Sequence, residues 1–296
     1  MDRPLRIGTR GSPLALVQAH MVAAALRASH GWTEAEVEIV PITTSGDRIQ
    51  DRPLAEVGGK ALWTKELDRC LLAGETDLSV HSMKDVETVR PDALAIAAML
   101  ERADPRDRLV GAASLEALIQ GARVGTSSPR RSAQLLARRP DLEIVLMRGN
   151  VQTRLAKLER GEADATLLAA AGLDRIGLNH VGAVIEGMIP APSQGAVGIE
   201  ILAGRTEIRA LVAAVDHEAT NRCVTAERAF LAALGGDCHS AVAAHAECRG
   251  EGIWLCAQIL SPDGGEVHGG EGQDPGALAR SLLAQASPKL RAMFAG

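Results

Sequence analysis

Short runs of alternating hydrophobic residues predict β-strands along the chain, and polar loops and amphipathic helices follow them. Residues 5–7 form the first run, and Ser12 and Pro13 then supply an N-cap and a first helical residue. The predicted helix has one hydrophobic face, formed by Leu14, Val17, Met21 and Ala25. Because backbone N–H groups point out of a helix start, this loop and its Arg10 have the outline of an anion pocket. An ordinary capped helix whose Arg10 faces water is the alternative.

The same arrangement recurs later in the chain. Residues 123–126 predict a strand, after which Ser128 and Pro129 open a helix. A Gly-Glu-x-Asp turn also precedes a predicted strand in each half, at residues 74–77 and 161–164. Two repeated features, the capped helix start and the Gly-Glu-x-Asp turn, occur in the same order in both halves. They indicate two α/β domains of similar plan, which we expect to face one another across a cleft.

The pattern changes near residue 219. An amphipathic helix is predicted over 219–234, and two glycines end it. Alternating segments at 241–248 and 253–260 follow, joined by a turn that contains Gly250, and a further short strand and a last helix complete the chain. This part is predicted to be a small α+β domain with an antiparallel sheet.

Two segments are expected to connect domains. Residues 101–107 are charged and contain a proline, and residues 189–195 contain two prolines and a glycine. A strand-like segment follows the second crossing, so the chain is expected to return to its first domain, and paired crossings permit hinge motion. The expected domains are residues 1–100 with 196–216, residues 105–191, and residues 219–296.

Composition narrows the class of protein. The 296 residues are 46% hydrophobic but only 2% aromatic, so the cores should be aliphatic. The five cysteines lack paired spacing, and no apolar run resembles a signal peptide or membrane span, so we expect a reduced cytoplasmic protein. A formal net charge of −5 argues against a general nucleic-acid binder.

Positive charge is nevertheless concentrated in one stretch. Residues 123–154 contain seven arginines and two acidic residues, which indicates a focused anion site. The arginines at strand ends or helix starts, and a further one at position 175, are Arg130, Arg131, Arg148, Arg154 and Arg175. Arginine favours planar, bidentate recognition of carboxylate or phosphate. Scattered surface arginines are the alternative.

A second candidate site follows the predicted strand near residues 77–81. Lys84 and Asp85 lie just past its carboxyl end, where ligands bind in open α/β sheets. An adjacent cation and carboxylate could hold an anion or serve in acid/base or electrostatic work. A solvated turn with a surface ion pair is the alternative.

Cys238 lies in a predicted loop between Asp237 and His239. It could be an inert thiol, a zinc ligand with His239, His245 and Cys248, or a point of covalent attachment. The zinc hypothesis lacks the paired spacing typical of such sites.

Several segments carry the motifs of a known family. In order over residues 5–260 they read RIGTRGSPLALVQA, VGGKALWTKEL, VHSMKDV, ERADPRD, VGTSSPRRSAQL, RGNVQTRLAKL, PAPSQGAVGIE and AERAFLAALGGDCHSAV. The chain thus resembles the porphobilinogen deaminase (hydroxymethylbilane synthase) family. The resemblance implies a monomeric transferase of tetrapyrrole (heme) biosynthesis that joins four porphobilinogen molecules head to tail, releases ammonia and hydrolyses the product to hydroxymethylbilane. It also implies two α/β domains similar to periplasmic-binding proteins.

The resemblance further implies roles for individual residues. A dipyrromethane cofactor would be joined by a thioether to Cys238, and Asp85 would be the catalytic carboxylate that stabilises positive charge on pyrrole nitrogens, with the proton donor left open. The residues that would hold the cofactor are Lys84, Asp85, Thr126, Ser128, Arg130, Arg131 and Arg148. Those that would hold the substrate are Arg10, Ser12, Arg148, Arg154, Arg175 and Gln194. No metal, nucleic acid or membrane is implied.

Four positions depart from the family pattern, namely Glu56, Trp63, Glu87 and Ser193. Lysine, phenylalanine, proline and glycine, respectively, are common there. None of the four is a matched site residue, so activity is still expected. The alternative function is a non-catalytic two-lobed binding protein for a small polyanionic ligand, which would need neither Cys238 nor a third domain.

Overall fold

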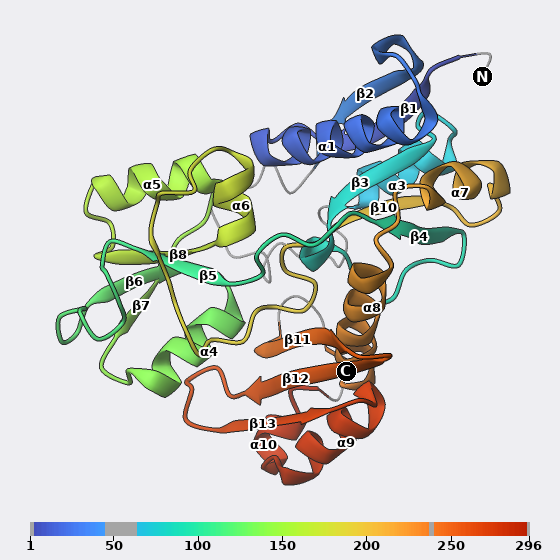
Figure 1. Ribbon diagram of the computed structural model, residues 1–296. Helices are drawn as coiled ribbons and strands as arrows, with labels where there is room; N and C mark the ends of the chain where they lie inside the picture. Colours follow the sequence, from blue (N-terminus) through green and yellow to red (C-terminus); the bar gives the residue numbers. More distant parts are fainter. Residues whose placement is uncertain (1–2, 45–63, 237–239, 295–296) are drawn as a thin grey trace. The chain divides into compact units, whose positions relative to one another are not determined.

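A computed structural model describes residues 3–44, 64–236 and 240–294 of the chain. The chain divides into two compact units, Met1–Ala103 with Ala196–Asn221 and Asp104–Gly195 with Arg222–Gly296. The described residues form two five-stranded sheets and one three-stranded sheet (Figure 1). The predicted class, α/β with a small antiparallel α+β part, is confirmed. The boundaries of three separate domains stay a prediction.

The first unit contains a mixed sheet with the strand order β2-β1-β3-β10-β4. Its strands are β1 (Leu5–Arg10), β2 (Val37–Ile42), β3 (Leu78–Ser82), β4 (Leu94–Met99) and β10 (Val197–Leu202). Its helices and 3-10 turns are α1 (Pro13–His30), η1 (Glu34–Glu36), α3 (Lys65–Leu72), η3 (Met83–Asp85) and α7 (Thr206–Ala213). Strand β10 runs antiparallel to β3 and β4, so the predicted return of the chain to its first sheet is confirmed.

The second unit contains a sheet of the same plan, with the order β7-β6-β8-β5-β9. Its strands are β5 (Asp107–Val110), β6 (Arg123–Thr126), β7 (Glu143–Leu146), β8 (Ala165–Ala169) and β9 (Ala183–Val184), and its helices are α4 (Pro129–Arg138), α5 (Val151–Glu159) and α6 (Ala170–Arg175). In each sheet three parallel strands lie side by side, with the earliest of them in the middle. An antiparallel strand lies next to the last of the three, β10 beside β3 and β5 beside β8. The predicted repeat of one α/β plan is therefore confirmed.

The repeated Gly-Glu-x-Asp turn has the same role in both sheets. Its glycine adopts a left-handed backbone conformation, with φ of 67° in one turn and 73° in the other. Asp77 then accepts the backbone N–H of Arg6 at 2.9 Å, and Asp164 accepts that of Arg123 at 2.7 Å. Each aspartate thereby ties the start of one parallel strand to the start of its neighbour.

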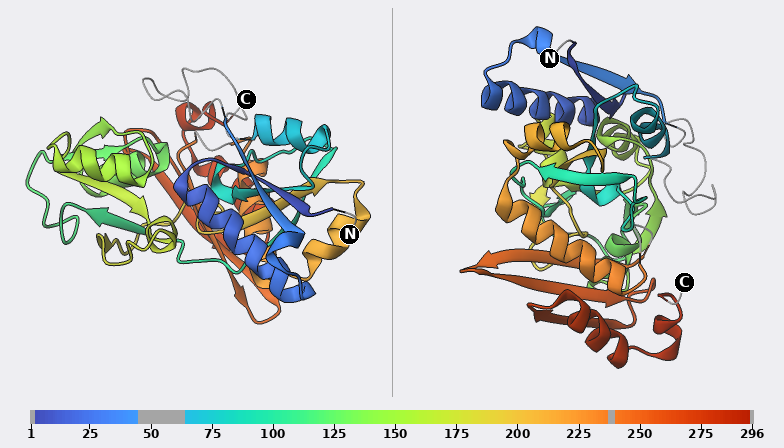
Figure 2. Two further views of the ribbon diagram at one scale, coloured as in Figure 1. Left: turned by 90° about the horizontal axis from the view of Figure 1, so that it is seen from above. Right: turned by 90° about the vertical axis from the view of Figure 1, so that its right-hand side faces the viewer.

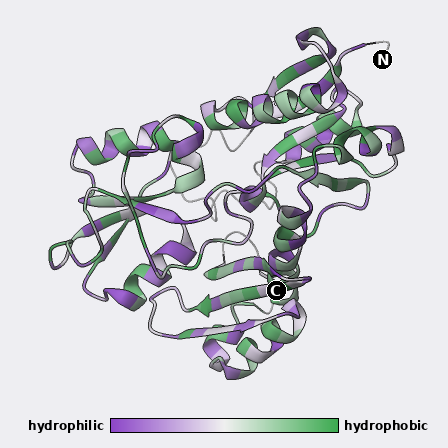
Figure 3. Ribbon diagram, viewed as in Figure 1, coloured by the Kyte–Doolittle hydropathy of each residue, from purple (hydrophilic) through white to green (hydrophobic). Residues whose placement is uncertain are grey.

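Helix α1 packs across β2, β1 and β3 (Figure 2). It begins at the predicted cap, because Ser12 Oγ accepts the N–H of Ala15 at 3.4 Å. Its buried positions are Gln18, Ala19, Val22, Ala23 and Leu26, whereas Leu14, Val17, Met21 and Ala25 are half-buried. The prediction was therefore wrong, because the buried face of the helix is displaced by one residue from the predicted face. Met21 and Ala25 lie at the border of the same core, and Figure 3 shows that the helices carry both hydrophobic and hydrophilic residues.

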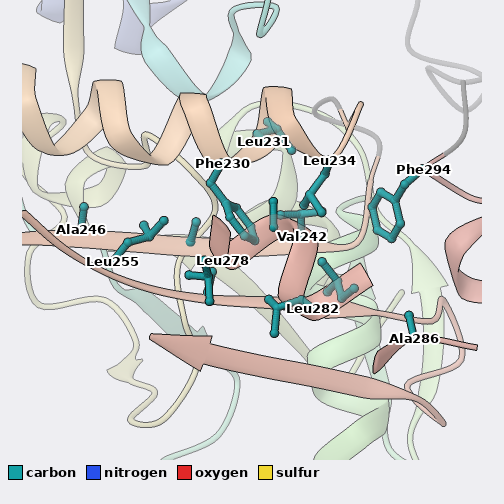
Figure 4. Close-up of a cluster of buried hydrophobic side chains, with 14 of the residues drawn as sticks. Phe230, Leu231, Leu234, Val242, Ala246, Leu255, Leu278, Leu282, Ala286 and Phe294 are labelled. Carbon is teal, nitrogen blue, oxygen red and sulfur yellow. The ribbon is translucent and has the colours of Figure 1, made fainter. Parts of the chain in front are cut away.

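The C-terminal residues form an antiparallel sheet in the order β11-β12-β13, as predicted. Its strands are β11 (Val242–Arg249), β12 (Gly252–Leu260) and β13 (Val267–Gly272), with helices α8 (Glu218–Ala233), α9 (Pro275–Gln285) and α10 (Pro288–Arg291). Phe230 of α8, Val242 of β11 and Leu282 of α9 meet in one buried cluster (Figure 4). Burial of these aliphatic and aromatic side chains stabilises the domain.

Helix α4 connects the second sheet to the C-terminal sheet within the same unit. Gln134 Nε2 donates a hydrogen bond to Gln258 Oε1 at 3.1 Å. Gly264, with φ of 69°, approaches α4 so closely that a Cβ there would lie 2.4 Å from the backbone N of Ala137. Glycine alone fits this approach, so α4 and the C-terminal sheet are packed as one body.

The predicted linker at residues 101–107 is wrong at its last position. Asp107 is the first residue of β5 and is only 2% exposed. A carboxylate can be buried in this way only when cations and hydrogen-bond donors compensate it, and the donors described below do so.

Candidate active site

In the first unit, the ends of two parallel strands bring predicted residues to one edge of the sheet. Strand β1 ends at Arg10, two residues before the Ser12 cap, and the η3 turn with Lys84 and Asp85 follows β3. Strands β1 and β3 are adjacent and parallel. All four residues therefore lie at or just past the carboxyl ends of strands, at the edge where α/β sheets bind ligands.

Asp85 is half-buried and makes no hydrogen bond or ion pair with the residues that the structure describes. The backbone beside it is held firmly, because Met83 is fully buried and its N–H donates to the carbonyl of Ala196 at 3.1 Å. Gly198 makes room for Met83, since a Cβ at 198 would lie 2.1 Å from the Met83 sulfur. An available carboxylate on a fixed turn can stabilise a cation or accept N–H donors.

Glu200 of β10 is a fully buried carboxylate that fastens both ends of the segment carrying Asp85. His81 Nε2 lies 2.9 Å from one of its oxygens, and Arg90 Nε donates to the other at 2.7 Å. Burial opposes ionisation of Glu200, but the hydrogen bonds from His81 and Arg90 outweigh it and lower its pKa to about 2. His81 precedes the turn and Arg90 follows it, so the ionised carboxylate holds the turn in one position.

Arg90 also draws two further carboxylates into this network. Its guanidinium lies 2.5 Å from Glu87 and 2.6 Å from Asp68, and the Thr64 hydroxyl donates to Glu87 at 2.8 Å. Burial works against the charge of Arg90, but the carboxylates outweigh it and raise its pKa above the ordinary value. Glu87 therefore gives this loop a hydrogen-bonded link where proline is common in the family that the sequence resembles.

In the second unit, polar groups gather after the carboxyl ends of β6 and β7. Ser128 Oγ accepts the N–H of Arg131 at 3.4 Å as the cap of α4, and Thr126 Oγ1 accepts the N–H of Ser128 at 3.1 Å. Arg154 of α5 donates to Ser127 Oγ at 3.4 Å. The structure thus brings together the predicted residues of this loop and of the helix that follows β7.

Asp107 organises three of the predicted residues. Arg130 donates to one carboxylate oxygen at 2.7 Å, and Arg131 and Gln194 donate to the other, each at 2.8 Å. Burial would raise the pKa of Asp107, but the two guanidinium groups outweigh it and hold that pKa well below its usual range. Arg130, Arg131 and Gln194 therefore have a shared partner inside the protein.

Several arginines of this unit retain buried donors that have no acceptor among the described residues. These donors are Arg130 Nε, Arg131 Nε, Arg148 Nη1 and Arg175 Nε. Arg148 is 9% exposed and makes no hydrogen bond or ion pair within the described ranges. Burial lowers the pKa of Arg175, whose Nη2 donates to the carbonyl of Gly195 at 2.6 Å.

An unmet buried donor costs about 1–3 kcal/mol. Planar guanidinium donors match carboxylates, with which they form bidentate, charge-assisted hydrogen bonds. These arginines therefore fit a ligand with several carboxylate groups, such as the implied dipyrromethane.

Some predicted residues cannot be placed. Cys238, Glu56 and Trp63 lie outside the described residues. Within the described ranges, no group of three or more His, Cys, Asp or Glu side chains could hold a metal ion. None of the described helices is both long and apolar enough to cross a membrane.

Sequence reasoning missed the residues that support the site, namely His81, Arg90, Asp107 and Glu200. The signal that could have identified them is their position in or beside the segments that carry the family motifs. Asp107 ends ERADPRD, and Glu200 ends PAPSQGAVGIE as a lone carboxylate after an apolar run.

Comparison with known families identifies this chemistry. The family described as "Porphobilinogen deaminase, dipyromethane cofactor binding domain" matches residues 5–210, and "Porphobilinogen deaminase, C-terminal domain" matches residues 221–290. The chain belongs to the porphobilinogen deaminase family. Porphobilinogen deaminase of Sphingopyxis alaskensis is 59% identical, with 99% of this chain and 98% of the relative covered. That of Paracoccus denitrificans is 50% identical, with 98% and 94% covered.

Porphobilinogen deaminases are transferases of tetrapyrrole biosynthesis with a dipyrromethane-binding domain, so the function and the cofactor implied by the sequence are confirmed. The alternative of a non-catalytic binding protein is not favoured. Among solved structures, the VFT2 domain of Bordetella pertussis BvgS is similar with a TM-score of 0.42 and 14% identity, covering 72% of this chain and 85% of that one.

Proposed function

We propose that this member of the porphobilinogen deaminase family uses Asp85 as its catalytic carboxylate and Cys238 as the attachment point of dipyrromethane. The arginines of the second unit bind the carboxylates of cofactor and product. The observation that carries the proposal is the set of buried guanidinium nitrogens without an acceptor among the described residues. Such donors match a product that gains two carboxylates with each pyrrole unit.

Asp85 stabilises the positive charge that develops on the pyrrole ring when ammonia leaves and when the next ring attacks. Its carboxylate has no competing partner in the described part of the chain, and the His81–Glu200–Arg90 network fixes the turn that presents it. Preorganised charge of this kind lowers a barrier without reorganisation during the reaction.

Arg130 and Arg131 direct their Nη2 groups to Asp107, and this leaves the Nε–H groups for a carboxylate of the cofactor. Arg148 serves cofactor and substrate and is the most available of the buried cations. The remaining cofactor ligands in this proposal are Lys84, Thr126 and Ser128, and the remaining substrate ligands are Arg10, Ser12, Arg154, Arg175 and Gln194.

When bound, the dipyrromethane supplies the terminal pyrrole from which the product is extended. The chain's own contribution is to bind the carboxylates, to orient the rings and to hold Asp85 beside the reacting nitrogen. We place the reaction in the cytoplasm and assign it to a monomer, because the cysteines lack the paired spacing of a disulfide framework and the family resemblance favours one subunit.

The first test compares the intact mass of the denatured protein with that of Cys238→Ser. We expect a mass excess equal to a two-pyrrole adduct that the variant lacks. A bare mass that stays bare after incubation with porphobilinogen contradicts attachment at Cys238.

The second test measures ammonia release by Asp85→Ala. We expect the adduct to persist and turnover to fall by about 10²-fold or more, since one preorganised electrostatic group contributes that much in other enzymes. Asp92→Ala is the matched control, because Asp92 is an exposed carboxylate shortly after the same turn. Equal turnover in the two variants refutes the role of Asp85.

A further inference from the structure

Two cysteines of the C-terminal domain meet in the described structure. Cys223 of α8 is 7% exposed, Cys248 of β11 is exposed, and their sulfur atoms lie 3.7 Å apart. Side chains alternate along a strand, so Cys248 shares the face of Ala244 and Ala246, which pack in the same cluster as Cys223. The contact therefore follows from the way α8 covers the sheet.

The two other cysteines that the structure describes are in different surroundings. Cys70 lies on α3 in the first unit, and Cys256 lies on β12 opposite His245. Burial raises the pKa of both thiols and disfavours the reactive thiolate. Within the described residues, the Cys223–Cys248 pair alone combines sulfur contact with an exposed member.

We propose that Cys223 and Cys248 form a reversible intramolecular disulfide, a modification site distinct from the attachment site at Cys238. A disulfide needs a sulfur separation of about 2.05 Å, so the two atoms must approach by roughly 1.6 Å. Cys248 lies near the end of the β11–β12 hairpin, where Arg249, Gly250 and Glu251 are exposed. The hairpin end can shift by this amount without repacking the core.

The oxidant that fits is a small disulfide such as oxidised glutathione. The Cys248 thiolate attacks it, forms a mixed disulfide and releases one glutathione thiolate. The Cys223 thiol then loses its proton, attacks the Cys248 sulfur and displaces the second glutathione. Two protein thiols are oxidised, one glutathione disulfide is reduced to two thiols, and no other reactant is required. A reducing cytoplasm keeps the pair as thiols, and an oxidising episode closes it.

Closure would act at the start of the C-terminal domain. Cys223 and Cys248 are 25 positions apart, and the loop that they close contains Cys238. Cys223 also lies just after Asn221, where the first unit ends. The disulfide therefore ties the start of α8 to the sheet and lowers the entropy of the unfolded C-terminal domain, which raises its melting temperature.

The test equilibrates the purified holoenzyme with oxidised glutathione and digests it without reduction, using a protease that cleaves after glutamate. Glu218, Glu227, Glu247 and Glu251 then separate Cys223, Cys238 and Cys248 onto three peptides. We expect a link between peptides 219–227 and 248–251, a loss of two hydrogens from the intact mass, and reversal by dithiothreitol. Cys223→Ser should instead retain one glutathione on Cys248, and Cys256→Ser, the matched control, should behave as wild type.

Two results overturn the proposed disulfide, and a third overturns its effect on stability. One is a wild-type protein that stops at the glutathione adduct. Another is a linked peptide that contains Cys238 or Cys256. The third is an oxidised protein with the linked peptides but no rise in melting temperature relative to Cys223→Ser, which would refute the stabilisation of the C-terminal domain.

Discussion

Asp107→Asn should destabilise the protein strongly, because it removes the negative charge between two buried guanidinium groups. Both arginines donate to Asp107 within 2.8 Å, and the residue is 2% exposed. At an effective dielectric constant of about 20, each pair contributes ~4 kcal/mol at roughly 4 Å between charge centres. The desolvation cost of the carboxylate, which the variant no longer bears, offsets part of this loss. We expect a net loss of about 3–5 kcal/mol in the free energy of unfolding, or roughly 6–20 °C in melting temperature.

The assay is denaturant unfolding followed by circular dichroism, together with calorimetric melting. Asp164→Asn is the matched control, because Asp164 also pairs with an arginine of the second sheet, at 3.3 Å from Arg123, but its side chain is 39% exposed. Exposed pairs contribute about 0–1 kcal/mol, so the control should remain close to wild type.

The pH dependence gives an independent check. The folded pKa of Asp107 is lower than the value of about 3.9 in an unfolded chain. Its stabilisation is therefore complete above roughly pH 5 and is lost as the pH falls below about 4 toward the folded pKa. The difference in the free energy of unfolding between wild type and Asp107→Asn should become smaller over that acidic range. A gap below about 1 kcal/mol near neutral pH, or one that widens on acidification, refutes the reasoning.

Three further outcomes are expected. Arg148→Ala should keep wild-type stability, because Arg148 has no ion pair in the described residues, but it should weaken cofactor assembly or chain elongation by roughly 10- to 100-fold. A variant with wild-type product yield and rate would show that Arg148 is not part of the site. Glu200→Gln should lower kcat by about 10- to 100-fold with little change in KM, because the turn bearing Asp85 loses its fixed position, and steady-state kinetics with an unchanged kcat would contradict this. Ser193→Gly should stabilise the protein by about 0.5–1 kcal/mol, because Ser193 has a left-handed φ of 66°, which favours glycine, whereas Ser193→Ala should not stabilise it. Equal unfolding curves for the two variants would show that the backbone at residue 193 is unstrained.

Much of the fold could be predicted because its signals are local. The Ser-Pro pairs at 12–13 and 128–129 marked the starts of α1 and α4, since a helix start depends on the cap and the first helical residues, which are local. Strands β2, β4, β5 and β9 were not predicted. Strand β4 reads LAIAAM without alternation, and β9 has two residues, so these strands depend on partners elsewhere in the sheet.

The residues of the candidate site also fall into two groups, those with a local sequence signal and those without one. Lys84, Asp85 and the arginines could be named because each lies in a short motif beside a predicted strand end. Asp107 and Glu200 could not, because Asp107 binds an arginine 23 positions away and Glu200 binds a histidine 119 positions away. Pairings at such distances depend on which strands become neighbours, and the strand order is not written in any local pattern.

The docking of α4 has a mechanical consequence. This helix carries Arg130 and Arg131 in its first turn and is packed against the C-terminal sheet through Gln134 and the close approach of Gly264. A group joined to the C-terminal domain, as we propose for the cofactor at Cys238, would belong to the same compact unit as these arginines. Three peptide crossings, near residues 103, 195 and 221, join this unit to the other one. A displacement of the C-terminal sheet would therefore carry Arg130 and Arg131 with it.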